Sequence, residues 1–193
     1  MRNSIKKSLY GNRGFSLVEI MVVIAIMMIL VSVAALSFSI VNNANVSKAA
    51  NSINSSFANS RATCLAKGLD AGTLTIKMIN GKAYSYIGSA ADGYAATASQ
   101  MEKITNNSMS FEYSVSANAV GGVKLADGDI KQYAFRPSGT MCVVNYSGTG
   151  DPTYTDFTIS EPYLCFIIKN KKRGARAFIY PETGRHDIGI WNF

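Results

Sequence analysis

Residues 14–20 read Gly14-Phe15-Ser16-Leu17-Val18-Glu19-Ile20, and the rest of the chain is interpreted outward from this stretch. A short polar leader precedes it and carries four basic residues, Arg2, Lys6, Lys7 and Arg13. Residues 20–36 follow without a single charge, so Glu19 is a lone carboxylate at the start of an apolar run. A carboxylate in a membrane segment costs a few kcal/mol, and one that is retained there indicates a function and a partner.

The apolar segment Phe15–Val41 is 27 residues long, more than the about 20 residues that a helix needs to cross a bilayer. Two simple interpretations of this segment are an ordinary secretory signal peptide and a plain membrane anchor. An ordinary secretory signal peptide would be cut within Ser32-Val33-Ala34-Ala35, but Glu19 interrupts its apolar region. A plain single-span anchor explains the length but neither the Gly14-Phe15 pair nor Glu19.

The net charge of +7 overstates how basic the exported part is. Four of the 19 Lys and Arg lie in the leader, residues 1–14, so 15 remain against 12 acidic residues, a net charge of +3. This balance does not favour a nucleic-acid-binding domain. The basic leader favours a cytoplasmic amino terminus, so the carboxyl-terminal part is expected to be exported. About 150 residues remain beyond the span, enough for one globular domain.

A single helix is predicted from Phe15 to Lys67, because no Pro or Gly occurs before Gly68, which would cap its carboxyl end. Asn and Ser become frequent from residue 42, so residues 15–41 form the membrane-spanning and assembly half and residues 42–67 an amphipathic half. One apolar stripe at helical spacing runs along the second half: Val46, Ala49, Ala50, Ile53, Phe57, Cys64 and Leu65.

Residues 68–193 switch to an alternating pattern with turn residues between short runs, which predicts a β-rich globular domain. The expected strands are Thr73–Ile79, Ala83–Ile87, Met109–Ser116, Ile130–Arg136, Thr140–Tyr146, Tyr163–Lys169, Ala175–Tyr180 and Arg185–Ile190. Turns are expected at Asn80-Gly81-Lys82 and Pro137-Ser138-Gly139, and a short helix at Tyr94–Thr105. The fold class is therefore α+β, with the long amino-terminal helix packed on an antiparallel sheet.

The order of basic leader, Gly14-Phe15, Glu19 and apolar helix resembles the class III signal of type IV pilins and pseudopilins. The resemblance implies that prepilin peptidase cuts between Gly14 and Phe15 and methylates the new amino terminus of Phe15. It also implies that Glu19 attracts the amino terminus of a neighbouring subunit during assembly. The expected partners are other pilin subunits, contacted through the helix, and a membrane assembly platform. The chain departs from many major pilins because its helix lacks a kinking proline.

Two later segments carry a narrower resemblance. Residues 133–140, with Phe135, Pro137 and Gly139, look like the F-x-P-x-G turn of minor pilins and pseudopilins related to the H-type subunit of type II secretion. Residues 177–185 look like the closing strand of that group, with its Gly-Arg ending at Gly184-Arg185. The alternative is that both are ordinary hairpin turns.

No catalytic, phosphate-binding or metal-binding motif occurs in the sequence, so neither an enzyme nor a cofactor is expected. Asp127 and Asp129 flank a glycine and are interpreted as a solvated turn rather than a calcium loop. Cys142 and Cys165 lie in strand-like runs and could form a disulfide across a sheet in an exported domain. The alternative is that both, like Cys64, are small buried apolar residues.

The densest basic cluster lies at an expected hairpin and contains Lys169, Lys171, Lys172, Arg173 and Arg176. It could contact DNA phosphates or anionic lipid, although a solvated hairpin tip is the simpler interpretation.

The sequence therefore predicts a structural subunit, a minor pilin, of a type IV pilus-like filament. It would be a single-pass protein of the cytoplasmic or inner membrane before it enters a surface pilus or a pseudopilus. The alternatives are a minor pseudopilin of type II secretion and a DNA-binding minor pilin of natural transformation.

Overall fold

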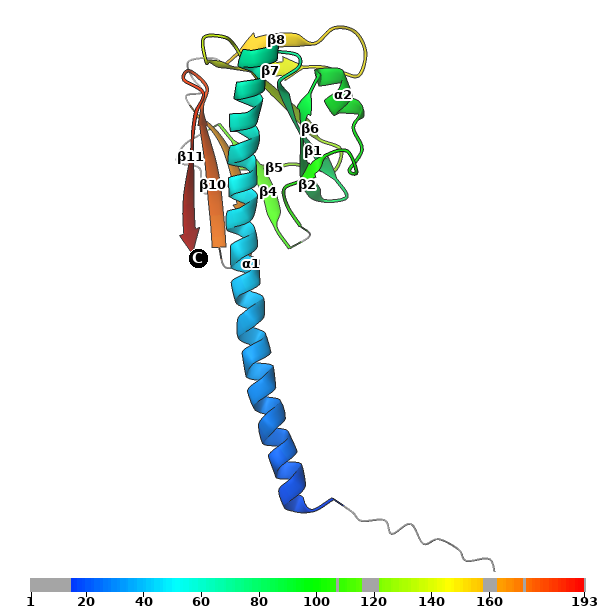
Figure 1. The fold of residues 1–193 in the computed structure, drawn as a ribbon, viewed down its shortest axis with the longest axis vertical. Coiled ribbons are helices and arrows are strands. Elements are labelled where there is room, and N and C mark those ends of the chain that lie inside the picture. Colours follow the sequence, from blue (N-terminus) through cyan, green and yellow to red (C-terminus); the bar gives the residue numbers. More distant parts are fainter. Residues whose placement is uncertain (1–14, 107, 116–121, 158–162, 172, 193) are drawn as a thin grey trace, which may run out of the picture. The chain divides into compact units, whose positions relative to one another are not determined.

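The computed structural model describes residues 15–106, 108–115, 122–157, 163–171 and 173–192, without the side chains of residues 34–40, 42, 43 and 192. The chain divides into two compact units, Met1–Ile40 and Val41–Phe193. Helix α1 (Leu17–Lys67) contributes residues to both units. In the second unit, β10 and β11 lie on one side of α1, and β1, β2 and α2 lie on the other (Figure 1).

Helix α1 is uninterrupted over 51 residues, as the absence of Pro and Gly predicts. It ends where Gly68 adopts a φ of +97°. The N–H of Gly68 donates to the carbonyl of Cys64 at 2.9 Å, which satisfies one of the last helical carbonyls. The predicted helix and its C-cap are confirmed.

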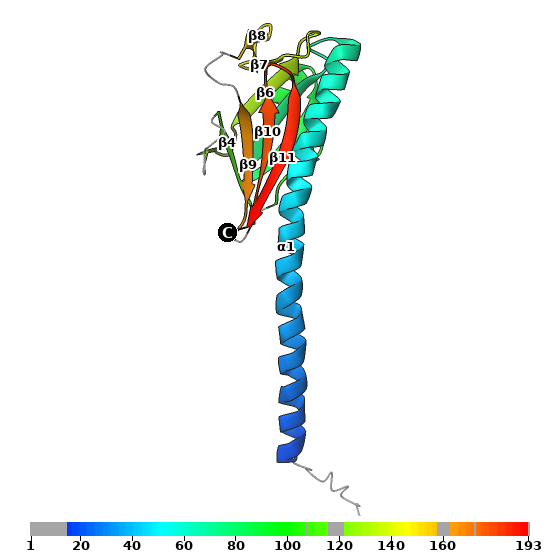
Figure 2. The same cartoon turned by 90° about the vertical axis from the view of Figure 1, so that its left-hand side faces the viewer.

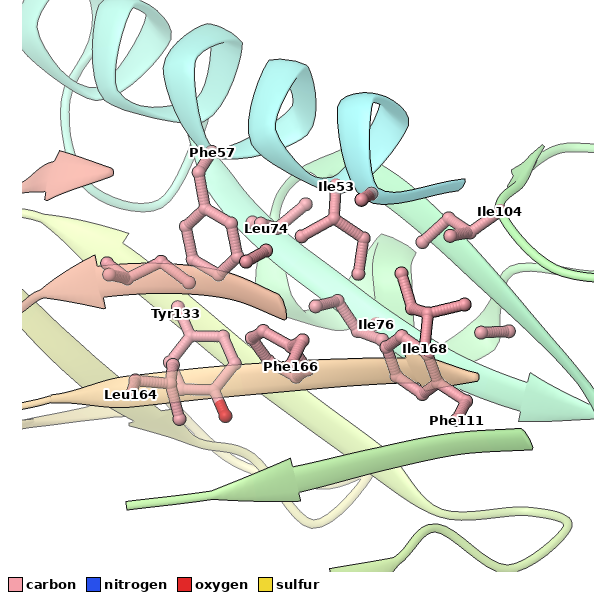
Figure 3. Packing of buried hydrophobic residues seen from close by; sticks show 14 of the residues in the cluster. Ile53, Phe57, Leu74, Ile76, Ile104, Phe111, Tyr133, Leu164, Phe166 and Ile168 are labelled. Atoms are coloured by element: carbon pink, nitrogen blue, oxygen red, sulfur yellow. The ribbon is translucent and has the colours of Figure 1, made fainter. Parts of the chain in front are cut away.

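The stripe on the second half of α1 forms one wall of the hydrophobic core. Val46, Ala49, Ala50, Ile53, Phe57 and Cys64 are buried, as predicted. Leu65 was wrongly assigned to this stripe: it is 52% exposed, and Ser60 is buried instead. The Phe57 ring lies 5.8 Å from Phe166 and 5.9 Å from Tyr133, centroid to centroid, so α1 is packed against strands from two sheets (Figure 3).

The first sheet has six strands, and every neighbouring pair is antiparallel. In spatial order they are β3 (Glu102–Lys103), β2 (Lys82–Gly88), β1 (Thr73–Ile79), β6 (Ile130–Phe135), β7 (Met141–Asn145) and β8 (Thr153–Asp156). Alternation places Tyr133 and Phe135 of β6 toward α1 and Gln132 on the opposite face. The short helix α2 (Ala90–Ala95) covers part of that opposite face.

The second sheet has five antiparallel strands. In spatial order they are β11 (Arg185–Asn192), β10 (Arg173–Tyr180), β9 (Leu164–Lys169), β4 (Ser110–Ser114) and β5 (Val123–Lys124). Strands β9, β10 and β11 lie side by side in Figure 2. Leu164, Phe166 and Ile168 of β9 point into the shared core (Figure 3).

The expected α+β class is confirmed, but the single sheet that the helix was expected to cover is in fact two sheets. The chain leaves the first sheet after β3, forms β4 and β5 in the second, and returns for β6, β7 and β8. Strand patterns do not encode this exchange, because pairing depends on contacts between distant segments. The turns at Asn80-Gly81 and Pro137-Ser138-Gly139 join paired strands, as predicted.

The helix expected at Tyr94–Thr105 is wrong. Helix α2 lies earlier, at Ala90–Ala95, where the Ser89 hydroxyl caps it by accepting from the N–H of Asp92 at 3.1 Å. Beyond it, the N–H of Thr97 donates to Gln100 Oε1 at 2.9 Å, which closes a turn before β3. Ser89 before Ala-Ala-Asp has the pattern of an N-cap, a signal that would have placed the helix at Ala90.

Candidate functional site

The amino-terminal end of α1 holds the residues predicted for processing and assembly. Gly14 lies outside the described residues, and Phe15, the first residue described, is 76% exposed. Helix α1 begins at Leu17, and the Ser16 hydroxyl caps it by accepting from the N–H of Glu19 at 3.2 Å. Glu19 therefore lies in the first helical turn, where the helix dipole favours a negative charge.

Ser16 is a residue that the sequence interpretation missed. Ser16 and Glu19 have the S-x-x-E spacing of a capping box, in which the side chain at the cap satisfies an otherwise unpaired helical N–H. That spacing was visible in the sequence. The cap fixes where the helix starts, and so it places Glu19 in the first turn of α1.

The surface around Glu19 is apolar and exposed. Every residue from Phe15 to Val33 is exposed, including Ile20, Ile24 and Met27. A continuous apolar surface of this extent indicates contact with a membrane or another protein. Within the part of the chain that the structure describes, no helix has both the length and the hydropathy required to span a membrane.

The predicted basic cluster does not form one free patch. Lys169 Nζ lies 2.8 Å from Glu112 Oε1 on the neighbouring strand β4, so its charge is balanced. The guanidinium of Arg176 lies 4.5 Å from the centre of the Trp191 ring, in a cation–π contact. Both residues are therefore engaged by neighbouring strands.

The other members of the cluster lie at the β9–β10 turn. Lys171 is exposed, and Lys172 lies outside the described residues. The N–H of Arg173 donates to Asn170 Oδ1 at 2.8 Å, which shapes the turn, and its side chain is half-buried. Contact of this cluster with DNA stays a prediction.

The three cysteines are all buried free thiols. Cys142 lies on β7 of the first sheet and Cys165 on β9 of the second, so the expected pairing across one sheet is not formed. Burial raises the pKa of the Cys165 thiol to about 11. These thiols therefore behave as small apolar residues, which was the alternative interpretation.

The expected turn at residues 127–129 is confirmed. Asp127 Oδ1 accepts from the N–H of Gly81 at 3.2 Å, and Asp129 Oδ2 accepts from the N–H of Ala126 at 2.7 Å. Both carboxylates therefore stabilise turns. Across the described residues, no three His, Cys, Asp or Glu side chains come together as metal ligands would.

The two segments with the narrower resemblance contact each other. The N–H of Met141 donates to the Pro181 carbonyl at 2.6 Å, joining the turn after β6 to the turn after β10. A Cβ added to Gly184 would lie 2.5 Å from the Gly139 carbonyl oxygen. Arg61 Nη1 of α1 donates to the Gly184 carbonyl at 3.4 Å. The two glycines therefore allow the two turns and α1 to meet.

Fold and site together define a class of protein: an α+β domain whose helix begins with an exposed apolar surface and carries a carboxylate in its capped first turn. The family model for the prokaryotic N-terminal methylation motif matches residues 10–35, a range that includes Gly14, Phe15 and Glu19. The chain thus carries the signal of type IV pilins and pseudopilins. Comparisons with curated proteins and with solved structures gave no significant match.

Proposed function

We propose that this chain is a structural subunit of a type IV pilus-like filament, a minor pilin rather than an enzyme. The observation that carries the proposal is the N-terminal methylation motif at residues 10–35, which extends into the first part of helix α1, where every residue from Phe15 to Val33 is exposed. In this proposal the segment Phe15–Val41 anchors the precursor in the membrane and then packs among the corresponding helices of other pilin subunits. The buried core of residues 41–193 remains outside the membrane.

Processing requires cleavage between Gly14 and Phe15 by prepilin peptidase. Gly14 has no side chain, so a protease can approach its backbone closely. Cleavage releases an amino group on Phe15 at the start of α1, two residues before the first helical residue. The basic leader keeps this end on the cytoplasmic side until it is removed.

Assembly in this proposal depends on Glu19. An unpaired carboxylate among apolar surroundings is costly, and the amine of a neighbouring Phe15 would offset that cost. Glu19 lies two residues into α1 and Phe15 two residues before it, so the two are separated by roughly 6–10 Å along the axis. A neighbour displaced by about one to two helical turns therefore brings its amine level with Glu19.

Two other roles use the same motif. A minor pseudopilin of type II secretion would be processed identically, and the signal alone does not separate it from a pilus subunit. A DNA-binding minor pilin would use the basic cluster, where Lys169 is paired with Glu112 and Lys171 is exposed. A structural role therefore has the stronger support. Salt-sensitive DNA retention that disappears when Lys171, Lys172 and Arg173 are neutralised would favour the DNA-binding role.

The first test is the mass of the amino-terminal peptide of the membrane-extracted chain, with and without the cognate prepilin peptidase. We expect a peptide that starts at N-methylated Phe15, and the uncut leader when the peptidase is missing. A start near Ala35, or an unchanged Met1 in the presence of the peptidase, would overturn the proposal.

The second test is assembly of the Glu19→Ala variant, measured as the amount of the chain in sheared filaments. Removing one member of an ion pair in apolar surroundings costs about 3 kcal/mol or more, so a decrease of at least about a hundredfold is expected. Glu182→Gln, at an exposed turn, is the matched control and should assemble normally. Normal assembly of Glu19→Ala with normal processing would contradict the assembly role and leave the processing result intact.

A further inference from the structure

A groove of about 440 Å³ lies on the face of the first sheet that points away from α1. Alternation along β6 and β7 places Ile130, Gln132 and Val144 on this face, opposite the core residue Tyr133. Its volume is within the range of small-molecule sites, about 300–1,000 Å³. The described residues that line it are Ile130, Gln132, Val144, Asn145, Tyr146, Ser147, Thr149, Asp151 and Thr153.

The wall of the groove is held in place by α2. The ring of Tyr94, on α2, lies edge-to-face against Tyr146 with ring centres 5.5 Å apart. Gly148 has a φ of +96°, and a Cβ there would lie 3.0 Å from the Tyr94 ring, so the loop is packed directly on α2. Lys77 Nζ donates to the carbonyl of Tyr94 at 2.8 Å and fixes the end of this helix. The groove is therefore formed before any ligand arrives.

The floor of the groove contains an amide oxygen without a partner. Gln132 is only 3% exposed, and its Nε2 donates to Thr75 Oγ1 at 2.9 Å and to the Ala90 carbonyl at 2.7 Å. Because a carbonyl only accepts hydrogen bonds, the contact with Ala90 fixes which end of the amide is the NH₂ group. No described residue donates to Gln132 Oε1. Gln132 Oε1 is accessible to water from the groove, so a ligand bound there would donate to it in place of water.

The remaining lining groups indicate which ligand would fit. Asp151 contributes an exposed carboxylate, and Ser147, Thr149 and Thr153 contribute hydroxyls that can donate or accept. Tyr146 contributes an aromatic ring, half-buried. No Lys or Arg is among the described lining residues, so phosphate and other anions have no counter-charge there.

We propose that this groove binds a neutral sugar. A sugar presents several hydroxyl donors to Gln132 Oε1 and Asp151, and its hydroxyls can also accept from the Ser and Thr side chains. Its C–H face suits an aromatic ring such as that of Tyr146. This binding function is separate from filament processing and assembly, because every lining residue lies in the unit Val41–Phe193.

The test is saturation-transfer difference NMR on the full chain in a detergent without a sugar head group. The probes are glucose, galactose, mannose, N-acetylglucosamine and N-acetylgalactosamine, at up to about 10 mM, which detects millimolar Kd values. Inorganic phosphate and n-butylamine probe the two charged alternatives. We expect saturation transfer to at least one sugar.

Three variants decide whether that binding occurs in the groove. Gln132→Met removes the floor acceptor, and Asp151→Asn removes the exposed carboxylate without altering the sheet. Either change should raise the Kd by up to about tenfold, the effect of losing one hydrogen bond. Glu182→Gln, outside the groove, should bind as the unmodified chain does.

The proposal is supported if a sugar binds and at least one of the two groove variants weakens binding while Glu182→Gln does not. It is overturned if no sugar gives saturation transfer, if only phosphate or n-butylamine binds, or if both groove variants bind sugar as tightly as the unmodified chain does. Asp151→Asn keeps the test decisive if Gln132→Met fails to fold, because Asp151 is exposed.

Discussion

The Glu112–Lys169 pair illustrates how one contact sets both charge and stability. Glu112 lies on β4 with a side chain that is 9% exposed, and Lys169 on β9 contacts it at 2.8 Å. The N–H of Gly122 donates to Glu112 Oε2 at 3.1 Å. Burial alone would raise the pKa of the Glu112 carboxyl, but these hydrogen bonds and the Lys169 charge outweigh it, so the pKa is lowered.

A lowered pKa makes the stability of the domain depend on pH. The pair contributes its full stability above the unfolded pKa of a glutamate, about 4.3, and loses it as the pH falls through the lower folded pKa. Glu112→Gln should reduce the free energy of unfolding at pH 7 by about 2 kcal/mol and flatten its decline at acid pH. Urea unfolding between pH 3 and pH 8 measures both effects. Glu182→Gln is the control, and an unchanged acid limb in Glu112→Gln would contradict this assignment.

The same pair shows why the position of Lys169 in the sequence, next to other basic residues, does not reveal that its charge is balanced. Glu112 is far from Lys169 along the chain, and the two meet only because β4 pairs with β9. Single-residue chemistry is predictable where the partners are neighbours, as with Ser16 and Glu19. It is not predictable where strand pairing brings them together.

At the scale of elements, whether a helix or strand could be predicted depends on how long its apolar pattern is. Helix α1 and all eight expected strands occur, because long apolar periodicities dominate those segments. Strands β3 and β5 are two residues long and β8 is four, too short for a repeated pattern to form. Their pairing, and the division into two sheets, depends on contacts that no local pattern records.

The meeting of two turns at Gly139 and Gly184 gives a prediction at this scale. Gly184→Ala would place a Cβ 2.5 Å from the Gly139 carbonyl at a φ of +61°, which combines backbone strain with a steric clash. We expect a loss of about 2 kcal/mol in the free energy of unfolding, measured by urea denaturation.

The matched control is Gly150→Ala. Gly150 has a φ of +80°, but nothing lies within 4 Å of an added Cβ, so only the backbone strain remains, about 1 kcal/mol. Equal losses in the two variants would mean that the turns do not constrain each other.

At the scale of the whole molecule, the methylation motif and the groove fall in different units. The methylation motif occupies residues 10–35, one continuous stretch, so it can be recognised from the sequence without knowledge of the fold. The groove is assembled from β6, β7, β8 and the loop between the last two, with α2 behind it. Because these segments meet only after folding, the sequence analysis contained no indication of the groove.

The separation of the two units leads to a prediction for a chain that starts at Val41. Every residue of the hydrophobic core cluster lies between Val46 and Ile188, so the shortened chain keeps the amphipathic part of α1 and both sheets. We expect a cooperative thermal transition, followed by circular dichroism, with a Tm within about 4 °C of the full chain, the shift that 1 kcal/mol produces. A matched shorter chain that starts at Gly68 lacks all of α1, including the Phe57 ring of the core. This chain should show no cooperative transition. If the chain starting at Val41 also failed to melt cooperatively, residues before it would have to contribute to the stability of the domain, and the two units could not be treated as independent.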